Sequence, residues 1–560
     1  MPPVEQSPAQ RTEMSVNEPV ASSLSDNLLS AFSGSNEFSK PDRRRYRVLV
    51  IFCLVSFNIG FCWIAFANVP RVAHGLFPAL TDEALAWTLN ANNLGQVAAT
   101  PFAIWLQQKP RKGLRYSVIG AALAQFTQAS LWAIASLCEM SHPLPAAAVL
   151  LTLLIGGASG GVACALTQGV VSKLSVMWFP PPSRGLATAI AFGSQYFGFA
   201  GSYTASLLLI CTPADLRTQL ICQALVAFAL LVVAWLAFPE MPRNHHHHHH
   251  HRGHSSSSSS SSSAAAPPPS PSSWSVVRDT WHRFERRQLS SALLLCMAIA
   301  LINGLFSAYQ TTLPLVYTDP SAGAAGPKCP PGKGAWARVI SARGVVLSLA
   351  AGLTYPAGSV LSGLVMDLKS CRQRLQLLQA IALVMLVVIF WFAMRLDKAD
   401  ATPPFAPYPP PAAPPPLPPP GNTTAGGDNG DAAELAPLLL LVGGAGLAAG
   451  WTMPAGMELL AEIGYPYITE GVSANVTMLL IQAAETALTA VAALLSPEQV
   501  NIVMLCGAAG AILFLVPVDA RYRRAAARGE RQPTGPIRDA LPPLGVESPV
   551  KDGTLDGPLN

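Results

Sequence analysis

Charged side chains are scarce in this sequence. Asp, Glu, Lys and Arg make up 12% of its 560 residues, whereas 51% are hydrophobic. A typical soluble protein carries roughly 25% charged residues. A water-soluble chain of this length needs a more charged surface, so the composition argues against a soluble enzyme or a nucleic-acid-binding module. The apolar content also excludes disorder over most of the chain.

Several functional signatures are missing as well. The sequence has neither the zinc motif HExxH nor the phosphate-binding motif GxxxxGK[ST]. None of its 11 histidines falls within a long apolar run, which argues against a histidine proton relay or a metal pathway. We therefore expect no enzyme activity, no cofactor and no metal site. The ten cysteines follow no framework spacing; Cys329, Cys138 and Cys211 fall near one membrane face, so a disulfide is considered only among these three.

Twelve long apolar runs occupy much of the chain. Each has about 20 residues or more, enough to cross a ~30 Å hydrocarbon core as a helix. Helices are expected because lipid offers no hydrogen-bond partner to the backbone. The sequence thus predicts an all-α membrane protein with 12 transmembrane helices, at about 48–69, 84–107, 114–137, 144–172, 185–210, 217–238, 288–313, 336–366, 375–396, 434–461, 468–495 and 499–518.

Lys and Arg gather in alternate loops. They precede the first run, lie between runs 2 and 3, 6 and 7, and 8 and 9, and follow the last run. The positive-inside rule then predicts that both termini are cytoplasmic, and an even number of spans agrees with this because it puts both termini on one side. We expect a monomeric multi-pass protein of the plasma membrane or an endomembrane, with the lipid bilayer and a small-molecule substrate as partners and no nucleic acid.

The runs divide six and six around a low-complexity linker. Two six-helix halves joined in this way resemble the major facilitator superfamily, whose substrate site lies near the midplane between the halves. The predicted order is a disordered N-tail (1–45), an N-terminal half (46–238), a cytoplasmic linker (239–287), a C-terminal half (288–520) with a disordered Pro-rich outer loop (401–433), and a disordered C-tail (521–560).

Both low-complexity segments carry one recognisable feature. The linker contains the histidine run 245–251 followed by serines, a composition typical of a flexible linker. A zinc-carrier hypothesis would rest on that run alone. The outer loop contains Asn422-Thr423-Thr424, an N-glycosylation acceptor pattern.

Polar side chains inside the apolar runs are the candidate functional residues, because placing them in lipid is costly. For an isolated amide, the competing interpretation is a hydrogen bond that holds two helices together. Clustering in runs 1, 5, 7 and 11 favours a site. The candidates include Asn58, Trp63, Asn68, Asn90, Asn92, Asn93, Gln96, Gln195, Tyr196, Asn303, Tyr309, Gln310, Glu458, Glu462, Glu470, Asn475, Gln482 and Glu485.

Two stretches resemble one known family. The first runs from Ser175-Val176-Met177-Trp178-Phe179 to Phe192-Gly193-Ser194-Gln195, and the second runs from Pro454-Ala455-Gly456-Met457-Glu458 through Glu462-Ile463-Gly464-Tyr465-Pro466 to Gln482. They are similar to the feline leukaemia virus subgroup C receptor-related family, solute carrier family 49. Two departures are Ser194, where the family has Asn, and Gln107-Gln108, where the family has an acidic loop residue.

The resemblance implies a carrier of choline or ethanolamine that works by alternating access. It carries over Trp63, Gln195 and Gln482 as substrate-binding residues, and places the family's aromatic of run 7 near Tyr309. Aromatic faces suit a quaternary ammonium, which has no hydrogen-bond donor. Glutamine amides can accept a hydrogen bond from an alcohol.

The same resemblance points to a cytoplasmic gate. Glu458 and Glu462 are spaced i, i+4 and so share one helix face. We expect them to pair with basic loop residues and close the inner gate, while the loop after run 8 keeps Asp367 and Arg372. Two alternatives stay open: a haem or pyridoxine-like carrier of the same family, and a transporter-like sensor or receptor that binds without transport.

Overall fold

The computed structural model describes residues 44–66, 68–109, 112–141, 145–180, 183–240, 286–316, 343–366, 371–396, 428–464, 470–492 and 497–518. Every secondary-structure element within these ranges is a helix. The predicted all-α class is confirmed. The tails, the histidine run, the Asn422 sequon and most of the linker lie outside the described residues.

Within the described residues of the first half, the chain forms six long helices and two short ones. The long helices are α2 (Arg44–Trp63), α4 (Asp82–Gln107), α5 (Gly113–Ser141), α6 (Ala146–Gln168), α8 (Arg184–Leu209) and α9 (Pro213–Ala237). In the predicted runs 48–69 and 144–172, the first helix ends before the run does, at Trp63 and at Gln168. α3 (Pro70–Leu76) restarts at a proline that suits a first helical turn, and α7 (Val171–Trp178) restarts after Gly169.

The second half forms six further long helices. They are α12 (Arg286–Val316), α14 (Arg343–Met366), α15 (Cys371–Leu396), α16 (Asp428–Gly464), α17 (Glu470–Ala492) and α18 (Pro497–Leu515). α16 begins at Asp428, inside the segment 401–433 that the sequence predicts as a disordered loop. Residues 428–433 therefore belong to the helix and not to the loop.

Eight of the described helical segments are long and apolar enough to cross a membrane. α15 and α18 contain shorter apolar stretches, Leu375–Met385 and Ile502–Leu515. α4 falls outside that set because it carries amides such as Asn92 and Gln96, both fully buried. Large apolar side chains such as Leu236 are instead exposed on the outside of the bundle, as a lipid-facing surface requires.

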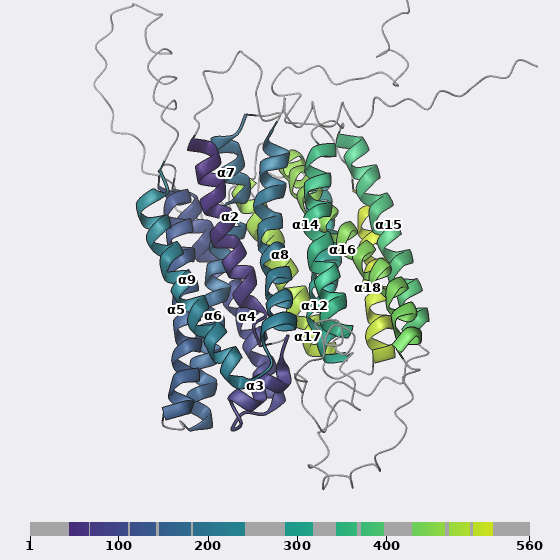
Figure 1. Ribbon diagram of the computed structural model, residues 1–560. Coiled ribbons are helices and arrows are strands. Elements are labelled where there is room, and N and C mark those ends of the chain that lie inside the picture. The colour runs from purple at the N-terminus through teal and green to yellow at the C-terminus, as the bar shows by residue number, and fades with distance from the viewer. Residues whose placement is uncertain are drawn as a thin grey trace, which may run out of the picture.

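The helices stand side by side, with those of the first half on the left of Figure 1 and those of the second half on the right. Within the first half, α4 packs on α6, α2 on α8, and α5 on α6 and α9. Within the second half, α14 and α15 pack on α16, and α12 on α17 and α18. The halves meet mainly where α8 packs on α14 and α4 packs on α17.

Glycines allow the closest of these contacts. A Cβ on Gly161 would collide with the backbone of α4 at Asn92, and one on Gly450 would collide with the backbone of α14 at Tyr355. Gly157 with Gly161 and Gly446 with Gly450 are small residues four positions apart, and this spacing brings helix backbones together here.

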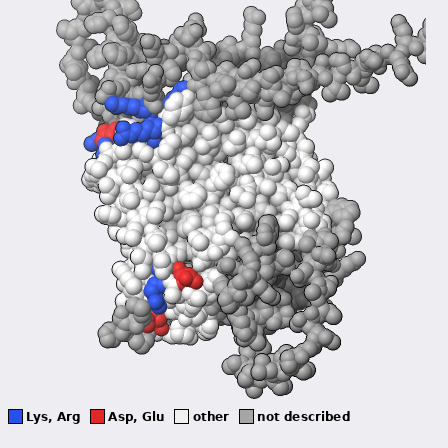
Figure 2. All heavy atoms as spheres, viewed as in Figure 1, with Lys and Arg blue, Asp and Glu red and all other residues white. Residues whose placement is uncertain are grey.

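Basic side chains gather at one end of the bundle. Figure 2 shows Lys and Arg at the upper end, a largely uncharged middle and few charges below. We call the upper end the basic end; its described members include Arg45, Lys109, Lys112, Arg115 and Lys173. Arg115 contacts Glu240 at 3.6 Å there and joins the start of α5 to the end of α9.

Candidate functional site

A chain of buried amides crosses the first half. Gln96 of α4 donates from Nε2 to Gln168 Oε1 of α6 at 2.7 Å, and Gln168 Nε2 donates to Gln195 Oε1 of α8 at 3.1 Å. Gln195 Nε2 in turn lies 3.2 Å from Cys164 Sγ. Each amide fixes the orientation of the next, so Gln195 is held in place from both sides.

Trp63 ends α2 close to this chain. Its backbone oxygen accepts a hydrogen bond from Asn92 Nδ2 at 3.3 Å, and Asn92 Oδ1 accepts one from Gln128 Nε2 at 3.0 Å. Gly60, one turn earlier, packs directly on the backbone of Gln195. The side chain of Trp63 is 4% exposed. The structure thus brings two of the predicted site residues, Trp63 and Gln195, to one helix contact.

An aromatic stack joins the two halves beside Gln195. Tyr196 of α8 stacks on Tyr355 of α14 with ring centroids 3.5 Å apart, and Phe306 of α12 stacks on the same tyrosine at 5.5 Å. Tyr355 donates from its hydroxyl to Asn303 Oδ1 at 2.9 Å, and Asn303 Nδ2 donates to Thr452 at 3.1 Å. The three stacked rings thus connect α8 of the first half with α12 and α14 of the second half.

Gln482 lies on α17, across from the first half. It is 5% exposed, and it is one of the polar side chains that surround the carboxyl of Glu485, one turn further along. Glu485 acts electrostatically on Cys164, the residue bound by Gln195. The two predicted glutamines therefore border the same region from opposite halves.

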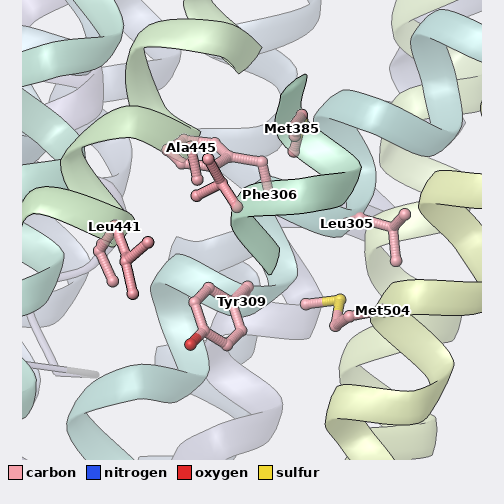
Figure 3. A pocket seen from close by; sticks show the side chains of 9 residues that line it. Leu305, Phe306, Tyr309, Met385, Leu441, Ala445 and Met504 are labelled. Atoms are coloured by element: carbon pink, nitrogen blue, oxygen red, sulfur yellow. The ribbon is translucent and has the colours of Figure 1, made fainter. Parts of the chain in front are cut away.

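Tyr309 lies elsewhere. Its side chain points into an apolar pocket within the second half, between α12, α15, α16 and α18 (Figure 3). Tyr309 faces another side of α12 than its neighbours: the Ser307 side chain lies near Glu485, and the Gln310 side chain donates from Nε2 to the backbone oxygen of Ser348 of α14 at 3.2 Å. The pocket is lined by Leu305, Phe306, Tyr309, Met385, Val388, Leu441, Val442, Ala445 and Met504.

The predicted gate residues are only partly described. Glu462 is buried and Glu458 half-buried in the last part of α16. Asp367 lies outside the described residues, and so does the side chain of Arg372 at the start of α15. The proposed pairing of the two glutamates with basic loop residues stays a prediction.

A contact that the sequence analysis did not single out closes the basic end. Asn475 of α17 donates from Nδ2 to Gln107 Oε1 of α4 at 2.6 Å, and so joins the halves. Lys173 binds the backbone oxygen of the same Gln107. Gln107 and Gln108 replace the acidic loop residue that the resemblance to solute carrier family 49 predicts for the cytoplasmic gate. The hydrogen bond between Asn475 and Gln107 lies at that position.

Towards the opposite end, another set of contacts joins the halves. Tyr203 of α8 donates to the backbone oxygen of Gln310 at 3.2 Å, and Ser348 of α14 donates to the same oxygen at 2.9 Å. Cys211, after α8, is disulfide-bonded. Cys138 is a free thiol, so the disulfide considered from the sequence does not involve it.

We expect Asn475→Ala to open the basic end. The variant removes a neutral hydrogen bond worth about 1 kcal/mol, which shifts a two-state population ratio roughly fivefold. Spin labels at the exposed positions Lys112→Cys and Gln376→Cys, with the exposed thiols Cys222 and Cys506 replaced by serine, report the separation of the halves. The fraction of long distances should rise.

Gln107→Ala is the matched partner of that experiment. It should produce the same shift, and the double variant should add nothing, because both changes remove one bond. An unchanged distance distribution in both single variants would show that the amide pair does not hold the halves.

Gln168, Gln128 and Tyr355 are site residues that the sequence analysis missed. Each is a polar or aromatic residue within an apolar run, so a complete inventory of such residues would have included them. No spacing in the sequence shows that Gln168 bridges Gln96 and Gln195, since the three residues come from three helices.

Solved structures with a similar fold are transporters. A D-xylose–proton symporter aligns with a TM-score of 0.55 and 14% identity, covering 85% of this chain and 99% of that one. A fucose transporter in the outward conformation aligns with a TM-score of 0.52 and 12% identity, covering 86% of this chain and 100% of that one. At such identities the likeness concerns the fold alone.

Curated relatives belong to solute carrier family 49. The member 4 homolog of Xenopus tropicalis is 27% identical over 174 residues, which cover 30% of this chain and 35% of that protein. Member A3 of Danio rerio is 24% identical over 210 residues, covering 36% and 42%. The chain therefore matches less than half the length of either relative, and both support the resemblance seen in the sequence.

The family model described as Major Facilitator Superfamily matches residues 48–402. That range runs from the first apolar run through α15 and includes Trp63, Gln195 and the α8–α14 contact between the halves. With its helical fold and its transporter neighbours, the chain belongs to the major facilitator superfamily.

Proposed function

We propose that this protein carries a small amine of the choline or ethanolamine type across a membrane by alternating access. The observation that carries the proposal is the set of amide and aromatic side chains buried between the halves. Gln195, held by the amide chain, lies next to the Tyr196–Tyr355 stack, and Gln482 borders the region from the other half.

The chemistry of these groups suits an amine that also carries a hydroxyl. A quaternary ammonium cannot donate hydrogen bonds, so aromatic faces are its best neutral partners, each worth ~0.5–2 kcal/mol. Trp63 and Tyr196 can supply such faces, and the amides of Gln195 and Gln482 can accept a hydrogen bond from the hydroxyl.

Alternating access needs contacts that break at one end while they persist at the other. The Asn475–Gln107 bond at the basic end and the Tyr203–Gln310 bond towards the opposite end have this form. By the positive-inside rule, we place the basic end and both termini in the cytoplasm. We propose that the carrier is a monomer. The two six-helix halves, residues 46–238 and 288–520, then move against each other on the linker 239–287.

Uptake into proteoliposomes tests the proposal. The reconstituted protein should take up labelled choline or ethanolamine saturably, and empty liposomes should not. Haem and pyridoxine, added as labelled substrates in parallel, test the other substrates implied by the family. Uptake of haem or pyridoxine alone would replace the amine with that substrate, and tight binding of choline without any uptake would identify a sensor or receptor.

A further inference from the structure

Glu485 is a carboxyl buried at the contact between the halves. It lies on α17, which packs on α4 and α12, and its side chain is 1% exposed. Ser307 of α12, Asn93 of α4 and Gln482 of α17 are the polar side chains that act on its carboxyl. Groups from both halves therefore meet at this one acid.

The hydrogen-bonding capacity around Glu485 is not used up. Among the described residues, Glu485 Oε1, both amide atoms of Asn93 and Gln482 Oε1 make no hydrogen bond of standard distance and angle, although Asn93 and Gln482 lie close enough to act on the Glu485 carboxyl. Buried polar atoms are nearly always satisfied, and leaving one unsatisfied costs free energy. Four open atoms on three neighbouring side chains indicate a place where a bound molecule completes the bonds.

Among the residues that the structure describes, no positive side chain compensates this carboxyl. α4, α6 and α17 contain no Lys, Arg or His, and neither does α12 beyond Arg287 nor α8 beyond Arg184. Within the part of the chain that the structure describes, Glu485 forms no ion pair. An uncompensated buried carboxylate is costly, and a cation placed beside it removes that cost.

Glu485 also borders the aromatic and amide groups described above. It acts electrostatically on Tyr196 and Cys164, and so reaches the residue that stacks on Tyr355 and the residue that Gln195 binds. A cation bound beside Glu485 would thus lie within the same region as the aromatic stack.

We propose that Glu485 recognises the positive charge of the substrate and makes the carrier selective for cations over neutral molecules of the same shape. The inference rests on the proposed function, which gives the ammonium group neutral aromatic partners but no partner of opposite charge. Asn93 and Gln482 bond the uncharged, polar part of the same molecule, because their amides are the other open groups.

A matched pair of ligands tests this assignment. Choline and 3,3-dimethylbutan-1-ol have the same shape, but a carbon replaces the ammonium nitrogen in the second. Direct binding to the purified wild-type protein in nanodiscs should favour choline. Glu485→Gln should weaken choline binding roughly 10- to 100-fold and change binding of the neutral alcohol less than about twofold, as expected for loss of one charge-assisted contact.

Two further variants complete the experiment. Glu485→Asp keeps the charge and should keep the preference for choline, which a merely structural role would not require. Glu240→Gln, at an exposed carboxyl of the Arg115 contact, is the control and should bind both ligands as wild type does.

Two results would overturn the assignment. The first is equal binding of the two ligands to the wild-type protein, a measurement that does not depend on whether a variant folds. The second is an unchanged preference for choline in correctly folded Glu485→Gln. Wild-type protein that binds and transports neither choline nor ethanolamine would instead refute the proposed function.

Discussion

Replacing Trp63 by alanine is expected to raise the KM for choline uptake roughly 30-fold, because a desolvated cation–π contact contributes about 2 kcal/mol. Trp63 is buried at the end of α2, one turn from the Gly60–Gln195 contact. The end of α2 that carries Trp63 is thus close to Gln195, whose amide the proposal gives to the substrate. The measurement is initial uptake rate against choline concentration in proteoliposomes of equal protein content.

Two variants separate binding from folding in that measurement. Trp63→Phe keeps an aromatic face and should recover most of the affinity. Trp87→Ala removes the same side chain from an exposed position of α4, where the tryptophan is 45% exposed, and should transport normally. A normal KM in correctly folded Trp63→Ala would remove this residue from the binding site.

Gly450→Ala is expected to lower the stability of the folded carrier by about 3 kcal/mol, the upper part of the usual range for overpacking. A Cβ at this position would overlap the backbone of Tyr355, which no side-chain rotation can relieve. α14 would have to move away from α16. Because Tyr355 also stacks on Tyr196, the shift would weaken the contact between the halves as well.

Gly444→Ala is the matched control on the same helix. Its Cβ would meet only methyl groups of Val388, at 3.9 Å, an ordinary van der Waals contact. Alanine stabilises a helix relative to glycine by roughly 1 kcal/mol, so this variant should melt at or above the wild-type temperature. Equal melting temperatures of the two variants in detergent would show that α14 and α16 do not need this close approach.

The helices were largely predictable from the sequence, and the breaks within them were not. A run of about 20 apolar residues implies a membrane helix because of the hydrocarbon thickness alone. Hydropathy could not show that the helix of the first run stops at Trp63, because Ile64, Ala65 and Phe66 directly after it are as apolar as the helix itself. The early start of α16 at Asp428 was equally hidden, since its first turns are polar.

The site was predictable by residue type but not by geometry. Trp63, Gln195 and Gln482 came from a resemblance. The structure places Trp63 and Gln195 on the packed helices α2 and α8, and Gln482 beside Glu485 on α17. The resemblance placed an aromatic residue near Tyr309, but the Tyr309 side chain lines an apolar pocket within the second half. On a helix with 3.6 residues per turn, a shift of two positions points a side chain about 200° away, so Ser307 and Tyr309 face different neighbours.

By itself, the sequence determined that this protein is a helical membrane protein with few charges, and where its basic residues lie along the chain. These properties depend on composition and local pattern. Only the tertiary structure decided which polar groups meet. Asn475 and Gln107 are 368 positions apart, and Glu485 faces Asn93 across the halves. Such contacts follow from how the helices pack, and the helices of two halves leave no local signature of their partners.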